Sequence, residues 1–196
     1  MRPILHHQLA QTDTLLVDLG RQLARYNAGD GDVDGAVSAL LASAAALYER
    51  QGRHDLQARF LAMGAELVTA RRGTDPVTLE PMRPRRDGVR RTVFRVLTTA
   101  EAQIGADYRQ TLSKLDALRE QLGPLLATGL ERGLLQPLLG SGPPDQPTLQ
   151  AIWAALTRDT GTGGAALRIN LQYAVYDVLL LIDDLLAPLL RPATPS

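Results

Sequence analysis

The sequence predicts a mainly α-helical fold that contains one β-hairpin. Apolar residues recur at spacings of three and four along most of the chain, which is typical of helices with one buried face. The stretch 77–97 departs from this pattern, because prolines interrupt it and β-branched residues crowd its second half. We therefore predict an N-terminal module with a hairpin over 1–98, a helical bundle over 99–190, and a disordered tail over 191–196.

The composition excludes several classes of protein and of functional site. The chain has 196 residues and no cysteine, which excludes disulfides, thiolate metal sites and a cysteine nucleophile. Its beginning lacks the long apolar core of a signal peptide. The most apolar run, 171–190, contains three aspartates, too many for a simple membrane span. We expect a cytoplasmic protein that does not enter a membrane.

The first half of the module reads as three helices. The first covers 3–27, and its apolar positions form a seam that serves either packing within the chain or a dimer. These positions are Leu5, Leu9, Thr12, Leu16, Leu19, Leu23 and Tyr26. A second helix covers 36–51, with Gly52 as a plausible C-cap, and a shorter third helix ends near Gly64. Two short helices joined by a tight turn fit a helix-turn-helix.

The loop between the first two helices resembles half of a calcium-binding loop. Asp30, Asp32 and Asp34 have the spacing of the first ligands of an EF-hand. The twelfth position, however, is Leu41, where a bidentate glutamate is needed. We therefore expect an ordinary turn, with Asp34 or a neighbour as N-cap, and no metal site.

The hairpin prediction rests on local signals around residue 88. Asp87-Gly88 is a strong turn pair, and the β-branched run 89–99 follows it. Thr98 and Glu101 then have the spacing of a capping box, which places the end of a strand near Leu97 and the start of a helix near residue 99. That helix should continue to about Leu122, where Gly123-Pro124 breaks or kinks it.

Charge is distributed unevenly along a chain of zero net charge. Residues 50–95 contain eleven arginines against five acidic residues, a net charge of +6, and the two flanking segments each carry −3. Such asymmetry points to a polyanionic partner.

The order of elements, three helices, a strand-like pair and a long helix, is that of a winged helix. The stretch "ELVTARRG…RPRRDGVRRTVFRVLTTAE" resembles the second strand, wing and third strand of winged-helix transcription regulators of the MarR and PadR type. The residues that carry the resemblance are Asp87, Gly88, Arg90, Arg91, Phe94, Leu97 and Thr98. The resemblance implies a homodimer that binds double-stranded DNA, regulates transcription, and responds in some cases to a small-molecule effector.

In that interpretation two groups of residues contact DNA. The hairpin tip would reach phosphates or the minor groove through Arg83, Arg85, Arg86, Arg90 and Arg91. The helix after the tight turn would read bases through Arg53, His54, Gln57 or Arg59. Three alternatives remain open: a solvated basic loop that pairs with the acidic flanks, an anionic partner other than DNA, and a helical interaction or scaffold protein without DNA binding. The absence of a hairpin at 77–97 would favour the interaction protein.

No set of residues predicts catalysis, and we expect neither an enzyme nor a cofactor. The adjacent His6 and His7 point about 100° apart on a helix, a poor chelating pair. The acidic residues of the last helix, Asp177, Asp183 and Asp184, lack the Glu-x-x-His motifs of bundle metal sites. We expect these acids to pair with arginines or to lie at helix ends. Packing is the expected role of three aromatic residues that could also line a ligand pocket: Trp153, Tyr173 and Tyr176.

Overall fold

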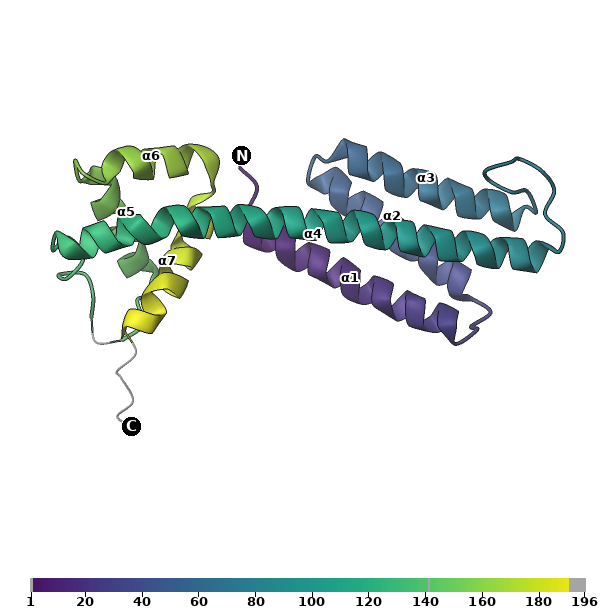
Figure 1. Cartoon of the computed structure of the whole chain (residues 1–196), viewed down its shortest axis with the longest axis horizontal. Coiled ribbons are helices and arrows are strands. Elements are labelled where there is room, and N and C mark those ends of the chain that lie inside the picture. The colour runs from purple at the N-terminus through teal and green to yellow at the C-terminus, as the bar shows by residue number, and fades with distance from the viewer. Residues whose placement is uncertain (1, 141, 191–196) are drawn as a thin grey trace. The chain divides into compact units, whose positions relative to one another are not determined.

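The computed structural model describes residues 2–140 and 142–190, and the predicted tail at 191–196 lies outside them. The described residues form seven α-helices and no strand (Figure 1). The helices are α1 Leu5–Asn27, α2 Val33–Arg50, α3 His54–Arg71, α4 Arg85–Glu131, α5 Gln146–Arg158, α6 Gly163–Gln172 and α7 Val175–Leu190. The predicted β-hairpin is therefore wrong, and with it the winged-helix-like module. Within the described ranges, only an isolated bridge between Thr74 and Pro81 has β geometry.

The stretch expected to be a strand is the beginning of α4. Its valines, at 89, 93 and 96, are spaced by four and three, so they share one face of a helix. Val93 and Val96 are buried in the core, and Val89 packs against it. β-branched residues lower helix propensity only slightly, so burial of this face overrides their preference for strands. The three valines have helical spacing in the sequence, whereas the β-branched composition of the stretch favours a strand.

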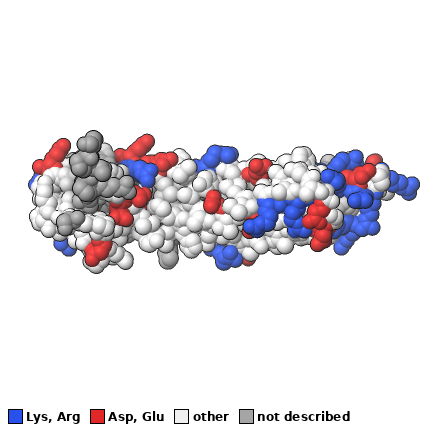
Figure 2. Space-filling model, turned by 90° about the horizontal axis from the view of Figure 1, so that it is seen from below, with Lys and Arg blue, Asp and Glu red and all other residues white. Residues whose placement is uncertain are grey.

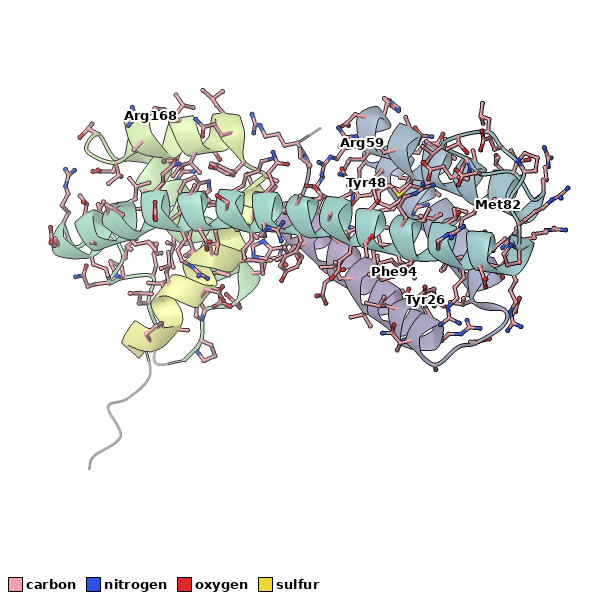
Figure 3. The ribbon with its side chains drawn as sticks, turned by 45° about the vertical axis from the view of Figure 1, so that its right-hand side comes forward. Tyr26, Tyr48, Arg59, Met82, Phe94 and Arg168 are labelled. Carbon is pink, nitrogen blue, oxygen red and sulfur yellow. The ribbon has the colours of Figure 1, made fainter. Side chains whose placement is uncertain are left out.

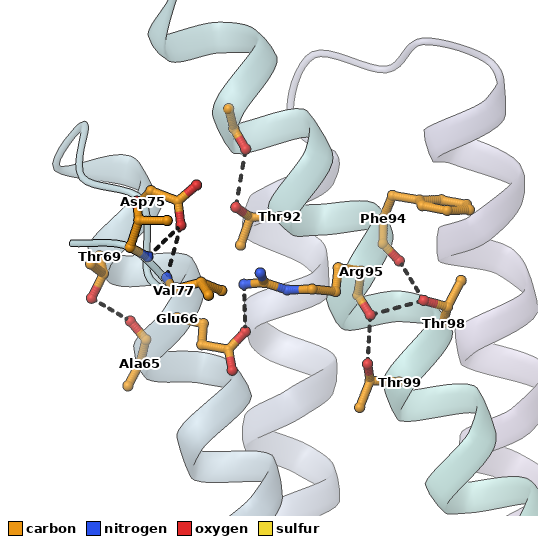
Figure 4. A network of polar contacts seen from close by, with 12 residues as sticks. Ala65, Glu66, Thr69, Asp75, Val77, Thr92, Phe94, Arg95, Thr98 and Thr99 are labelled. Atoms are coloured by element: carbon orange, nitrogen blue, oxygen red, sulfur yellow. Dashed lines mark hydrogen bonds and ion pairs between the residues drawn. The ribbon is translucent and has the colours of Figure 1, made fainter. Parts of the chain in front are cut away.

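The predicted capping box is an ordinary turn inside α4. The hydroxyl of Thr98 donates to the carbonyl of Phe94 at 3.1 Å, and that of Thr99 donates to the carbonyl of Arg95 at 2.8 Å (Figure 4). The helix begins directly after Pro84 and continues past Gly123-Pro124 to Glu131. Pro124 lies on the exposed side of α4, where water can bond the carbonyl that the proline leaves unpaired. The third helix also runs beyond its expected end, because Gly64 lies within α3.

The chain divides into two compact units, and each has its own packing. Unit 2 covers Leu9–Gln110 and contains most of α1, all of α2 and α3, and the first part of α4. Its core includes Leu15 and Leu19 of α1, and Tyr48 and Phe60 stack at 5.4 Å between ring centroids. Of the predicted first-helix seam, Leu19 lies in this core and Leu16, Leu23 and Tyr26 pack against it, which confirms packing within the chain for these four residues.

Unit 1 comprises Met1–Gln8 and Thr111–Ser196. Asp177, at the start of α7, is fully buried and accepts bonds from the backbone N–H groups of Leu5 at 2.8 Å and His6 at 3.0 Å. The Nδ1 atom of His6 lies 2.7 Å from the same carboxylate. Asp184 pairs with Arg119 at 3.3 Å. The expectation that these acids lie at helix ends or pair with arginines is confirmed for Asp177 and Asp184.

No helix in the described part of the chain is long and apolar enough to cross a membrane.

Candidate functional site

The largest group of arginines lies where α3 ends and α4 begins. We call this surface the basic end and define it by seven residues: Arg71, Arg72, Arg83, Arg85, Arg86, Arg90 and Arg91. Figure 2 shows basic side chains gathered at this end of unit 2, with a few acidic side chains among them. Over residues 71–91 the seven arginines face three acidic residues, a net charge of +4. The arginines therefore lie together although the predicted hairpin does not form.

The loop between α3 and α4 brings Arg71 and Arg72 close to the arginines at positions 83–91. The backbone N–H of Met82 donates to the carbonyl of Gly73 at 2.8 Å, and the side chain of Arg85 donates to the carbonyl of Arg71. Inside the loop, Asp75 accepts from the N–H groups of Val77 at 2.8 Å and Thr78 at 3.2 Å (Figure 4). These two bonds hold the pKa of Asp75 below its ordinary value. The ionised carboxylate is the form that accepts these two bonds.

Met82 fixes the loop to the helix. Its side chain is buried against Gly88, where an added Cβ atom would lie only 2.3 Å from the methionine Sδ. Gly88 was expected to form a hairpin turn with Asp87. Instead, its lack of a side chain leaves room on α4 for Met82. Asp87 lies in the first turn of the helix, where a negative charge is favourable.

Some arginines of the basic end already have partners. Arg71 pairs with Asp34 at 2.7 Å, and Arg85 bonds the backbone as described. The guanidinium of Arg90 lies over the ring of Tyr26, 4.9 Å from its centroid, and that ring stacks on Phe94 (Figure 3). The others are exposed and form no ion pair with any described residue: Arg72, Arg83, Arg86 and Arg91.

The four residues expected to read bases lie at the other end of α3. Arg53 precedes the first turn of α3, and the 18 residues of the helix span about 27 Å. Arg59 donates to Oε1 of Gln103 at 2.6 Å, and the Nδ1 atom of His54 lies 3.1 Å from Oε1 of Gln57. The structure therefore brings the wing arginines together but leaves Arg53, His54, Gln57 and Arg59 far along the helix from them.

Arg53 belongs to a buried polar cluster that the sequence analysis missed. Its guanidinium pairs with Asp107, whose side chain is 3% exposed, and lies over the ring of Tyr48 at 5.6 Å. The hydroxyl of Tyr48 is buried beside Asp107. Burial raises the pKa of Tyr48, and the nearby charge of Asp107 adds to this effect. The signal was an acid at position 107, three residues after the core-facing Ile104.

Two aspartates of the loop 27–35, Asp30 and Asp34, each form an ion pair with an arginine. Asp30 pairs with Arg25 at 2.7 Å and accepts from the N–H of Asp32 at 2.9 Å. The bond from Asp32, and then Arg25, hold the pKa of Asp30 below its ordinary value. Asp34 pairs with Arg71 across the bundle. Within the described ranges no three His, Asp or Glu side chains converge as metal ligands would.

The three aromatic residues of unit 1 differ in their surroundings. Trp153 is buried, and its indole N–H donates to Oδ1 of Asn170 at 3.2 Å, so it packs α5 against α6. Packing, the expected role, is confirmed for Trp153. Tyr173 is half-buried and Tyr176 is exposed.

Comparison with family models, with curated proteins and with solved structures finds no match to this chain.

Proposed function

We propose that this protein is a non-enzymatic binding protein whose basic end contacts the phosphates of double-stranded DNA. The observation that carries the proposal is the group of four exposed arginines without an acidic partner among the described residues: Arg72, Arg83, Arg86 and Arg91. An arginine that is already ion-paired must give up its partner to bind phosphate, whereas these four need not. Guanidinium groups also bind phosphate oxygens in a bidentate manner.

Sequence-independent binding is the mode that this surface supports. Contacts to phosphates provide affinity and orientation, but they do not distinguish one base from another. The predicted wing is absent from the described residues, and Arg53, which was expected to read bases, is paired with Asp107. A role in transcription would then come from where the protein is recruited, and not from recognition of an operator.

A gel-shift series on a random DNA duplex tests the proposal. With about four phosphate contacts, affinity should fall about 100-fold between 50 and 200 mM salt. The variant with Arg83→Gln, Arg86→Gln and Arg91→Gln should lose at least about tenfold in affinity at low salt and show a shallower salt slope. The matched control is the single variant Arg168→Gln, which removes an exposed arginine of α6 in unit 1. Equal binding by the triple variant and the parent would disprove the proposal.

The second candidate is a helical interaction protein, and two observations favour it. The first is the absence of a hairpin among residues 77–97. The second is a pair of exposed leucines on α6, Leu167 and Leu171, which are 57% and 66% exposed and lie on one face of the helix. In this form the protein would self-associate through α6. Sedimentation velocity on the parent and on the double variant Leu167→Glu, Leu171→Glu decides this candidate, because a monomeric parent excludes it.

A further inference from the structure

Beside the basic end, a groove of about 470 Å³ lies between the loop 27–33 and the first turns of α4. Its rim carries Arg85, Arg86 and Arg90, and its apolar surface comes from Val33, Val89 and Val93. Gly29 and Gly31 form part of the loop wall, and a Cβ atom at either would meet nothing within 4 Å. The groove therefore has room for a small molecule, and its volume is within the usual range for ligand sites.

The charge of the groove is not balanced from within. Its two carboxylates are already paired with arginines outside the lining, Asp30 with Arg25 and Asp34 with Arg71, each at 2.7 Å. The three lining arginines have no carboxylate partner among the described residues. The groove therefore presents positive charge without a counter-ion from the protein.

Arg90 is held in the orientation that a carboxylate needs. One face of its guanidinium covers the Tyr26 ring, and the same ring stacks on Phe94 with 5.6 Å between centroids. A stacked guanidinium keeps its N–H groups in the plane of the fork. In Arg90 the Nη2 group donates to the backbone carbonyl of Tyr26 at 3.5 Å, which leaves the other N–H groups for an anion at the edge. Arg86, four residues earlier, lies on the same side of α4, so the two positive groups can share one acidic headgroup.

We propose that this groove binds an amphipathic acid, a carboxylate or phosphate monoester that carries a short apolar tail. The headgroup bonds Arg86 and Arg90, and the tail covers the valines between them and the loop. A fully polar anion would leave the valines wet, and a neutral apolar molecule would leave the arginines without a counter-ion. The proposal does not depend on DNA binding, since it uses a concave site and Arg90, although Arg86 belongs to both groups of arginines.

Isothermal titration calorimetry on the full chain tests this site with four probes. Octanoate and octyl phosphate carry both features, octanol lacks the charge, and acetate lacks the tail. We expect a Kd of about 0.1–1 mM for at least one of the two acids, and affinity at least tenfold weaker for octanol and acetate. Absence of binding by both acids at these concentrations, or equal binding of octanol, overturns the proposal.

Two single variants locate the site. Arg86→Gln removes a lining guanidinium and should weaken the acid at least fivefold. Arg91→Gln removes an exposed neighbour that does not line the groove, and it should leave the acid affinity within twofold of the parent. Circular dichroism checks that both variants are folded. An acid that binds Arg86→Gln as tightly as the parent overturns the proposal. Arg86 belongs to both proposals, but Arg91 belongs to the proposed DNA contact and not to the groove, so Arg91→Gln distinguishes failure of one proposal from failure of the other.

Discussion

Arginines at the two ends of α3 have opposite surroundings. At the first end, Arg53 pairs with the buried Asp107 and covers Tyr48. At the other end, Arg72 and its exposed neighbours form no ion pair with described residues. All belong to the same positively charged segment of the sequence, yet one contributes to folding and the others are available for a partner. Residue type and clustering therefore do not distinguish these arginines from one another, whereas the presence or absence of an opposing carboxylate does.

The largest expected effect comes from breaking the buried pair. Asp107→Ala leaves Arg53 without its partner beside the core, and we expect a loss of about 3 kcal/mol in the free energy of unfolding. Urea denaturation measures this change. The double variant Arg53→Met, Asp107→Leu replaces both charges with apolar groups and should recover most of the loss. A cost below about 1 kcal/mol for Asp107→Ala would show that the pair does not stabilise the bundle.

An intermediate effect is expected at Gly88, where the loop meets the helix. Alanine usually stabilises a helix by about 1 kcal/mol relative to glycine. At position 88 its Cβ would displace Met82, and loss of that buried side chain costs about 2 kcal/mol. We expect Gly88→Ala to destabilise unit 2 by about 1 kcal/mol and to speed hydrogen exchange at the N–H of Met82.

The control for this change is Gly20→Ala in α1, where a Cβ atom meets nothing within 4 Å. That variant should raise stability by up to about 1 kcal/mol. If both alanines stabilise the protein equally, Met82 does not hold the loop.

The smallest effect on stability should come from the exposed arginines. The triple variant Arg83→Gln, Arg86→Gln, Arg91→Gln removes three charges with no ion partner among the described residues, so we expect a change within about 0.5 kcal/mol. Thermal unfolding compares it with Asp107→Ala. A loss similar to that of the buried pair would mean that the two ends of α3 do not differ as described.

The first helix and the segment 85–97 differ in how far along the chain their sequence signals extend. The first helix was predicted within two residues at its start, because its apolar spacing extends over more than twenty residues. The prediction for the segment 85–97 was wrong. An Asp-Gly pair, several β-branched residues and the three prolines that precede the segment all indicated a hairpin over a short range. Burial of one face of α4 against α1–α3 decides its structure, and a contact between distant segments is not visible in local propensity.

The candidate site was predicted in part. The five arginines of the expected wing tip do lie together, because they are close in sequence and four of them lie in the first turns of α4, with Arg83 just before it. Arg71 and Arg72 join them only through the loop that Met82 fixes to Gly88, a contact that no spacing rule predicts. The pairing of Arg53 with a residue 54 positions away was equally hidden.

The bond from Asp177 to the first turn of α1 has a consequence for the order of synthesis. The N–H of His6 and the carboxylate that accepts its bond are 171 residues apart. At about 5–20 residues per second, a ribosome needs roughly 9–34 s to make the intervening chain. Residues 9–110 form a contiguous unit and can fold during that interval, whereas unit 1 has to wait for α7. Folding during translation should therefore begin with the unit that carries the arginines and end with the bond that closes the other.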